Sequence, residues 1–299
     1  MLNPLLKIEF LREGRGARLS LMVIFYNAIL ALITIMIMLV NSQSYLEGYY
    51  YDPSTSRFQF IIISTIQIGC SLLLGTIMTW SLYARDQEGI YRESFPLVPG
   101  YCNHIINSRM ALVVMVNLLL FLSSLPILLI SVIYSGVTVF QVVRLGIEIL
   151  MCALWSTALT ACCCVFGRNG FFSAFLTLLM EVFFFIGTYL LVAVVNGRFN
   201  IMGAENVLAG SGHMVYNAGT VMTMLVMSLN PISSYVGYRI NIIGDSGMFQ
   251  SFCAGIGVDV NSRLFSYVFY KMSAVMMVIF SLLMIWLSIR HLRRRRPGK

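Results

Sequence analysis

Three ionisable residues lie inside long apolar stretches of the sequence, where they could carry protons or ions. Glu181 stands near the middle of an apolar run over residues 171–195. Arg144 and Glu148 are four residues apart in the run over 140–166, so one face of a helix would hold them as a pair. A charge in hydrocarbon is costly and is usually paired or turned toward a cavity. These three residues are therefore candidates for an intramembrane relay.

Each of them also has a structural interpretation. Gln141, Arg144 and Glu148 share one helical face, and an ion pair between Arg144 and Glu148 near the outer surface would account for their position. Glu181 could be protonated and hydrogen-bonded to a neighbouring helix. Both kinds of interpretation stay open from the sequence.

The patterns that usually carry enzyme chemistry are missing from the sequence. It contains no G-x-x-x-x-G-K-[ST] phosphate loop, no H-E-x-x-H and no G-x-S-x-G, and its three histidines are scattered. The seven cysteines form no C-x-x-C pair, and those inside apolar runs are expected to be packing residues. We therefore expect no catalytic residue, no metal site and no nucleotide site of the chain's own.

The candidate residues depend on helices long enough to cross a bilayer. Hydrophobic residues make up 59% of the 299 residues and charged residues 11%, against about 45–50% and about 25% in soluble domains. A spanning helix needs about 20 apolar residues, and lipid offers no water to unpaired backbone groups. The sequence therefore predicts an all-α polytopic membrane protein with six transmembrane helices. They are expected near 19–40, 58–83, 110–134, 140–166, 171–195 and 264–289.

The segment over residues 196–263 tests the number of spans. Its apolar stretch over 218–229 is short for a span and ends at Asn230-Pro231, so we expect re-entrant or interfacial helices in this outer segment. A seventh span there would place the arginines at 293–296 on the side opposite to the basic N-terminal segment, against the positive-inside tendency. Six spans instead place both termini in the cytoplasm. Most basic residues then lie inside: Lys7, Arg12, Arg15, Arg18, Arg85, Arg92, Arg109, Arg168, Arg290, Arg293, Arg294, Arg295, Arg296 and Lys299.

The parts outside the spans are short. We expect an interfacial helix over residues 1–17, a cytoplasmic loop over 84–109, the outer segment over 196–263 and a basic cytoplasmic tail over 290–299. None is long enough for an enzyme domain of its own, so residues 1–299 form a single transmembrane domain. The net charge of +8 gathers at span ends, where it suits lipid headgroups and not nucleic acid.

The cytoplasmic loop over residues 84–109 has a pattern of its own. Charged residues fill its first half, and an apolar stretch with two prolines follows, which predicts a short helix with an apolar tip. A pump without a nucleotide site needs such a surface, where a separate motor can push. The loop residues of interest are Glu88, Glu93, Phe95, Pro99, Ile105 and Arg109.

With this loop the chain resembles the transmembrane subunits of type-2 ATP-binding cassette exporters. In that family the loop commonly runs Glu, five residues on another Glu, six further a Pro, and then an Ile and a basic residue that opens span three. Residues with these spacings are Glu88, Glu93, Pro99, Ile105 and Arg109. The family also has six spans, cytoplasmic termini, an N-terminal interfacial helix and outer re-entrant helices before span six. The chain departs from the family pattern at Gly89-Ile90 and at Pro96.

The resemblance implies the permease subunit of an ATP-driven exporter in a bacterial cytoplasmic membrane. Separate ABC ATPase subunits, which bind ATP and Mg, would dock on the loop, and a second permease protomer, the same or a related chain, would complete the transporter. The chain itself would bind no cofactor. Because its spans hold few polar groups, we expect a hydrophobic or amphipathic substrate such as a peptide, a lipid or a drug.

Two other functional classes remain open from the sequence. The first is an ion-coupled secondary transporter or channel subunit, in which Glu181, together with Arg144 and Glu148, forms the relay. The second is a membrane-embedded enzyme or a structural scaffold, and the absence of clustered His, Asp or Glu residues argues against the enzyme.

Overall fold

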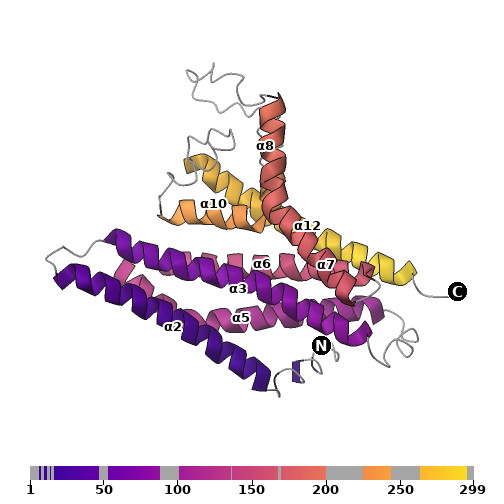
Figure 1. Ribbon diagram of the computed structural model, residues 1–299, viewed down its shortest axis with the longest axis horizontal. Coiled ribbons are helices and arrows are strands. Elements are labelled where there is room, and N and C mark those ends of the chain that lie inside the picture. Colours follow the sequence, from indigo (N-terminus) through magenta and orange to yellow (C-terminus); the bar gives the residue numbers. More distant parts are fainter. Residues whose placement is uncertain are drawn as a thin grey trace. The chain divides into compact units, whose positions relative to one another are not determined.

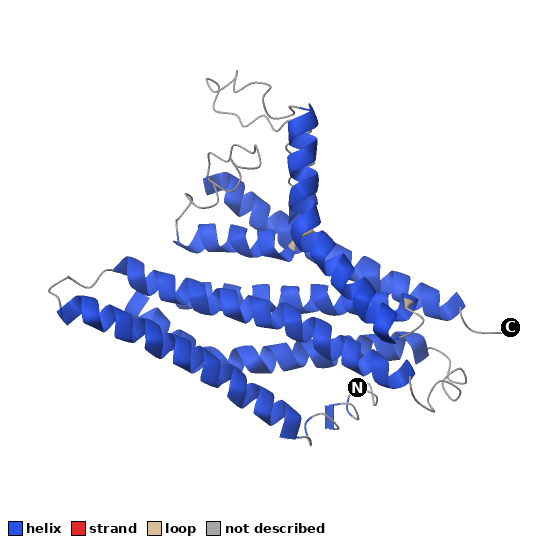
Figure 2. Cartoon of the chain, in the orientation of Figure 1, coloured by secondary structure: helices blue, strands red, loops and turns tan. Residues whose placement is uncertain are grey.

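The computed structural model of the chain is helical throughout the long elements that it describes (Figure 2). It describes residues 17–46, 53–87, 101–135, 137–167, 170–199, 225–243 and 263–294, and the single positions 7, 10, 11 and 14. Six helices in these ranges are long and apolar enough to cross a bilayer: Ala17–Val40, Gln59–Ala84, Ile105–Ile130, Val139–Phe166, Gly170–Val194 and Phe269–Leu292. The predicted all-α class with six spans is confirmed, whereas the predicted interfacial helix over 1–17 lies largely outside the described residues.

The contacts divide the chain into two compact units. Unit 1 comprises Met1–Ala174 and Leu283–Lys299, and unit 2 comprises Phe175–Leu282. Unit 1 is a bundle of the long helices α2 (Ala17–Leu46), α3 (Pro53–Gln87), α5 (Tyr101–Ser135) and α6 (Val139–Phe166) (Figure 1). Helix α3 packs against both α5 and α6, and α2 packs mainly against α5. Most of α6 is buried within this bundle.

Small residues let α3 and α6 approach each other closely. A Cβ atom at Gly75 of α3 would overlap the Oγ atom of Ser156 on α6. A Cβ atom at Gly146 of α6 would lie 2.7 Å from a ring carbon of Phe121 on α5. In lipid, where the hydrophobic effect does not drive helices together, such close packing is a main source of association. The two glycines therefore set the spacing of the three central helices.

Unit 2 contains an interruption in the fifth span. Helix α7 (Gly170–Val182) is followed by a π-helical turn, η2 (Phe183–Gly187), and then by α8 (Thr188–Phe199). The helix axis changes direction between α7 and α8 (Figure 1), as is common at a π-bulge. Unit 2 also contains α10 (Pro231–Ile243), which at 13 residues is short for a span.

The last helix, α12 (Arg263–Arg294), contributes its first part to unit 2 and its end to unit 1. Within unit 2, a Cβ atom at Gly237 of α10 would lie 3.1 Å from the ring of Phe269 on α12. The rings of Phe184 and Phe280 meet edge to face, with centroids 4.9 Å apart. The core of unit 2 therefore joins η2, α10 and α12.

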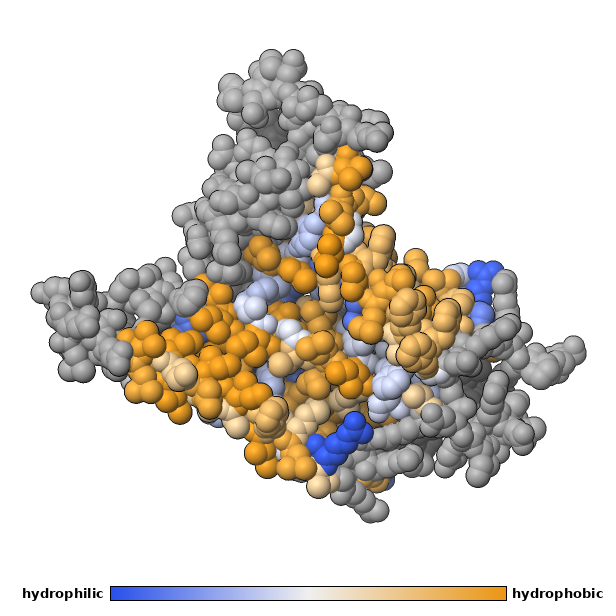
Figure 3. All heavy atoms as spheres, viewed as in Figure 1, coloured by the Kyte–Doolittle hydropathy of each residue, from blue (hydrophilic) through white to orange (hydrophobic). Residues whose placement is uncertain are grey.

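Large apolar side chains cover the outside of several spans. On α2, Leu21, Ile24, Phe25 and Leu32 are each at least 60% exposed, and Figure 3 shows the apolar surface over this helix. Soluble proteins rarely expose continuous apolar patches of this kind. These faces suit contact with lipid hydrocarbon, in agreement with a multi-pass membrane protein.

Candidate functional site

The two helices that flank the predicted coupling loop meet at Arg109. Arg109 of α5 is buried, with 7% of its surface exposed, and its guanidinium carbon lies 4.7 Å from the ring centroid of Tyr83 on α3. Tyr83 in turn packs with Ala161 and Cys164 of α6. This buried cation–π contact therefore joins the loop ends of α3 and α5 to the central helix.

The same end of unit 1 also includes the end of α12. Ile106 and Met110 of α5 and Ala158 of α6 form a cluster with apolar residues of α12, among them Ile289. His291 lies against the ring of Phe166, with centroids 4.3 Å apart. The loop end of unit 1 is thus one packed block of four helices.

The structure describes only part of the predicted coupling residues. Arg109 is buried in the block described above, and Ile105, one turn before it, is half-buried. The other four, Glu88, Glu93, Phe95 and Pro99, lie outside the described residues. Arg109, which the family spacing places at the opening of the third span, lies inside a longer helix: α5 begins at Tyr101, and the charge of Arg109 is packed over Tyr83.

Arg144 and Glu148 lie one turn apart near the beginning of α6. Glu148 is buried, with 1% exposed, whereas the guanidinium carbon of Arg144 lies 4.7 Å from the ring centroid of Phe140. Gln141 caps the helix, since its Oε1 atom accepts a 2.8 Å hydrogen bond from the backbone N–H of Thr138. Cation–π packing and capping thus give Arg144 and Gln141 structural roles. The predicted ion pair between Arg144 and Glu148 stays a prediction.

Glu181 belongs to unit 2, in the last turn of α7. It is buried, with 8% exposed, while its neighbour Val182 is 55% exposed. The carboxyl group therefore sits on the inner side of the helix, as an ionisable group in a span should. It also stands two residues before the π-turn η2, so it lies next to the place where the span changes direction.

Amide side chains link the helices of unit 1. The Nδ2 atom of Asn27 on α2 donates to Ser123 Oγ on α5 at 2.9 Å, and Gln67 Nε2 on α3 donates to Ser124 Oγ at 2.8 Å. These two bonds join neighbouring spans. Asn117 differs, because its Nδ2 atom donates to Val113 O of its own helix at 3.0 Å.

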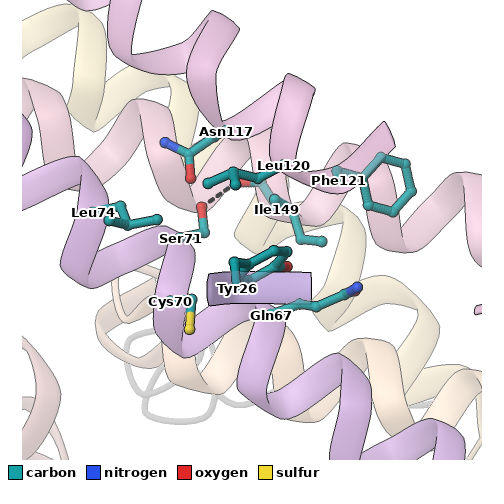
Figure 4. A pocket seen from close by; sticks show the side chains of 9 residues that line it. All are labelled: Tyr26, Gln67, Cys70, Ser71, Leu74, Asn117, Leu120, Phe121 and Ile149. Carbon is teal, nitrogen blue, oxygen red and sulfur yellow. Dashed lines mark hydrogen bonds between the residues drawn. The ribbon is translucent and has the colours of Figure 1, made fainter. Parts of the chain in front are cut away.

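A small cavity lies among α2, α3, α5 and α6 (Figure 4). Tyr26, Gln67, Ser71 and Asn117 line it, and Ser71 Oγ donates to Ile149 O across it at 3.0 Å. The volume of this cavity is about 10 Å³, close to the roughly 10–15 Å³ of cavity volume that one water molecule needs. The cavity suits a single water molecule and is far too small for a transported molecule.

A second polar centre, in unit 2, surrounds Asn230. This residue is fully buried, and its Nδ2 atom donates to Phe185 O at 3.2 Å and to Thr188 Oγ1 at 3.0 Å. Its Oδ1 atom accepts a 2.9 Å bond from the backbone N–H of Ile232. Asn230 therefore caps α10 and at the same time binds the π-turn of the fifth span. The sequence shows the capping signal, an Asn before a Pro, but not the distant partner.

Within the part of the chain that the structure describes, no group of three His, Cys, Asp or Glu side chains could hold a metal ion. Comparison with protein-family models, with curated proteins and with solved structures gives no match.

Proposed function

We propose that this chain is the permease subunit of an ATP-driven exporter of the type-2 ATP-binding cassette class, and that it moves a hydrophobic or amphipathic molecule such as a peptide, a lipid or a drug. The observation that carries the proposal is the buried contact between Arg109 and Tyr83. It joins α3 and α5, the two helices between which the loop over 84–109 lies, close to where that loop begins and ends.

Separate ABC ATPase subunits would dock on this loop. When they bind ATP and Mg and close, they would push the loop, with Glu88 and Glu93 among the contact residues. The packed helices at the loop end of unit 1 would transmit this movement from the loop to the rest of the bundle. Arg109 and Tyr83 connect α5 to α3, and Tyr83 packs against Ala161 of α6, so the helices would move together.

The interior of unit 1 supports a transport route at the surface of the protomer. Helices α3 and α6 are in close contact at Gly75 and Ser156, and the cavity beside Gln67 holds no more than about one water. A bulky substrate has no place there. A second permease protomer, the same chain or a related one, would provide the other wall of the route.

Charge reversal of the loop tests this function. The chain is purified from its native membrane as wild type and with Glu88→Lys and Glu93→Lys together, and co-purified ATPases are identified by mass spectrometry. We expect the wild type to retain an ABC ATPase and the variant to lose it. Arg92→Glu is the matched control, because it changes a charge of the same loop at a position outside the family spacing. A wild-type preparation without any ATPase, or an unchanged complex in the variant, contradicts the proposal.

A second candidate function rests on Glu181. Its burial within a span suits the proton or ion relay of an ion-coupled transporter or channel subunit. In that case Glu181→Gln would stop transport, and depletion of ATP at constant membrane potential would not. In an ATP-driven permease the two results are reversed.

A further inference from the structure

The regular backbone hydrogen bonding of the fifth span is interrupted at its π-turn. A π-turn inserts an extra residue into an α-helix, so the regular i→i−4 ladder is interrupted and a backbone carbonyl is left to find another partner. Such a carbonyl in lipid is costly unless it is hydrogen-bonded. Here the turn covers Phe183–Gly187, and the carbonyl of Phe185 within it receives a hydrogen bond from Asn230.

The side chain of Asn230 is committed to this arrangement. One of its donor bonds reaches Phe185 O at 3.2 Å and the other reaches Thr188 Oγ1 at 3.0 Å. The Thr188 hydroxyl itself donates back to Phe184 O at 2.8 Å. Asn230 thus binds the carbonyl of Phe185 in the π-turn and the hydroxyl of Thr188, which is itself bonded to Phe184 of the same turn.

A second link joins the same two helices one residue further along. The hydroxyl groups of Tyr189 on α8 and Ser233 on α10 lie 2.7 Å apart. The backbone N–H of Ser234 donates to Asn230 O at 3.1 Å, so the first turn of α10 is fixed to Asn230 as well. The first turns of α8 and α10 are therefore connected at two points, through Asn230 and through Tyr189.

We propose that η2 is a hinge in the fifth span and that Asn230 links α8 to α10, so that these two helices move as one body about the hinge. During transport, a movement of α10 would then also move α8, and a movement of α8 would also move α10. That role rests on the proposed function, whereas the hinge and its link do not. Asn230 is a positioning residue: it acts through the π-turn and needs no contact with the transported molecule.

Two substitutions at Asn230 separate its two tasks. Asn230→Ser keeps an oxygen that can cap α10, but its side chain is too short to reach Phe185 O. Asn230→Ala removes both the cap and the link. Asn117→Ala is the matched control, because Asn117 is also a buried amide, with 2% exposed, yet donates only to its own helix.

Hydrogen exchange measured by mass spectrometry on the full chain in lipid nanodiscs, without ATP or any ATPase, tests the link. For Asn230→Ser we expect exchange in a peptide over residues 183–199 to be about fivefold faster or more, because two hydrogen bonds are lost. Exchange over 231–243 should stay within about twofold of wild type. Asn230→Ala should accelerate both peptides, and Asn117→Ala neither.

Three results overturn the proposal. Unchanged exchange over 183–199 in Asn230→Ser would mean that Asn230 does not hold the π-turn. Acceleration confined to 231–243 in Asn230→Ala would make Asn230 a helix cap only. Equal acceleration over 101–135 in Asn230→Ser would show a general loss of folding instead of a local hinge. Because no nucleotide is present, these results do not depend on whether the chain is an ATP-driven permease.

Discussion

The guanidinium group of Arg109 lies over the ring of Tyr83, with its carbon 4.7 Å from the centroid, and both residues are buried. A charged residue at this depth would be costly without a partner. The pair connects α5 to α3 on either side of the predicted coupling loop. The contact therefore gives Arg109 a structural role that can be measured as stability of the bundle, separately from the transmission proposed for it.

The first prediction concerns stability. Arg109→Gln should lower the free energy of unfolding by about 2 kcal/mol, because a desolvated cation–π contact is lost. Arg290→Gln is the matched control. Arg290 lies over the ring of Trp286 with its carbon 5.1 Å from the centroid, but Trp286 is 54% exposed, so its loss should cost about 0.5–1 kcal/mol. Thermal unfolding of the purified variants provides the comparison, and equal effects would contradict the assignment.

The second prediction concerns the contact of α3 with α6. Gly75→Ala should destabilise the bundle by about 1–3 kcal/mol, because the new Cβ atom overlaps Ser156 Oγ, so that either this hydroxyl gives up its bond to Ala153 O or the helices move apart. Gly69→Ala, on the same helix, has nothing within 4 Å of the new atom. It should be neutral or stabilising by up to about 1 kcal/mol, since Ala favours a helix. A thermal-shift assay in detergent that ranks the two variants in the opposite order would show that α3 and α6 are not packed in this way.

The third prediction separates two amides of unit 1. Gln67→Leu should cost about 1 kcal/mol, since it removes the hydrogen bond between α3 and α5. Asn117→Leu removes only a bond within α5 and adds apolar volume next to the water-sized cavity, so it should cost less. Stability of both variants is measured by thermal unfolding at one lipid composition. If Asn117→Leu costs more, Asn117 has a role between helices that its bond to Val113 does not reveal.

Hydropathy and charge predicted the fold class because each span must be long and apolar, whatever its neighbours are. They could not predict that Arg109 lies inside helix α5 with its charge packed over the ring of Tyr83, because a basic residue at that position is also typical of a span end. The spacing placed Gln141 on one helical face with Arg144 and Glu148, but it did not predict that the oxygen of Gln141 caps the helix. A cap depends on the turn geometry at Thr138, and face spacing alone does not contain this information.

The polar centre at Asn230 was beyond the reach of sequence reasoning for a different reason. Its partners, Phe185 and Thr188, lie more than forty positions earlier in the chain, and no local pattern connects the two segments. The π-turn itself has no sequence signature in the phenylalanine-rich run at 183–185. The burial of Glu148 and Glu181, by contrast, agrees with their expected position inside spans, because charges avoid lipid.

The most direct test of the proposed function is the energy source of transport. The purified complex in proteoliposomes is supplied with a fluorescent hydrophobic peptide as the probe, and ionophores remove every ion gradient and the membrane potential. Wild type and Glu181→Gln are compared with and without ATP. We predict ATP-dependent movement of the probe in both proteins. Movement that needs an ion gradient, ignores ATP and disappears in Glu181→Gln would contradict the proposal and favour the ion-coupled carrier.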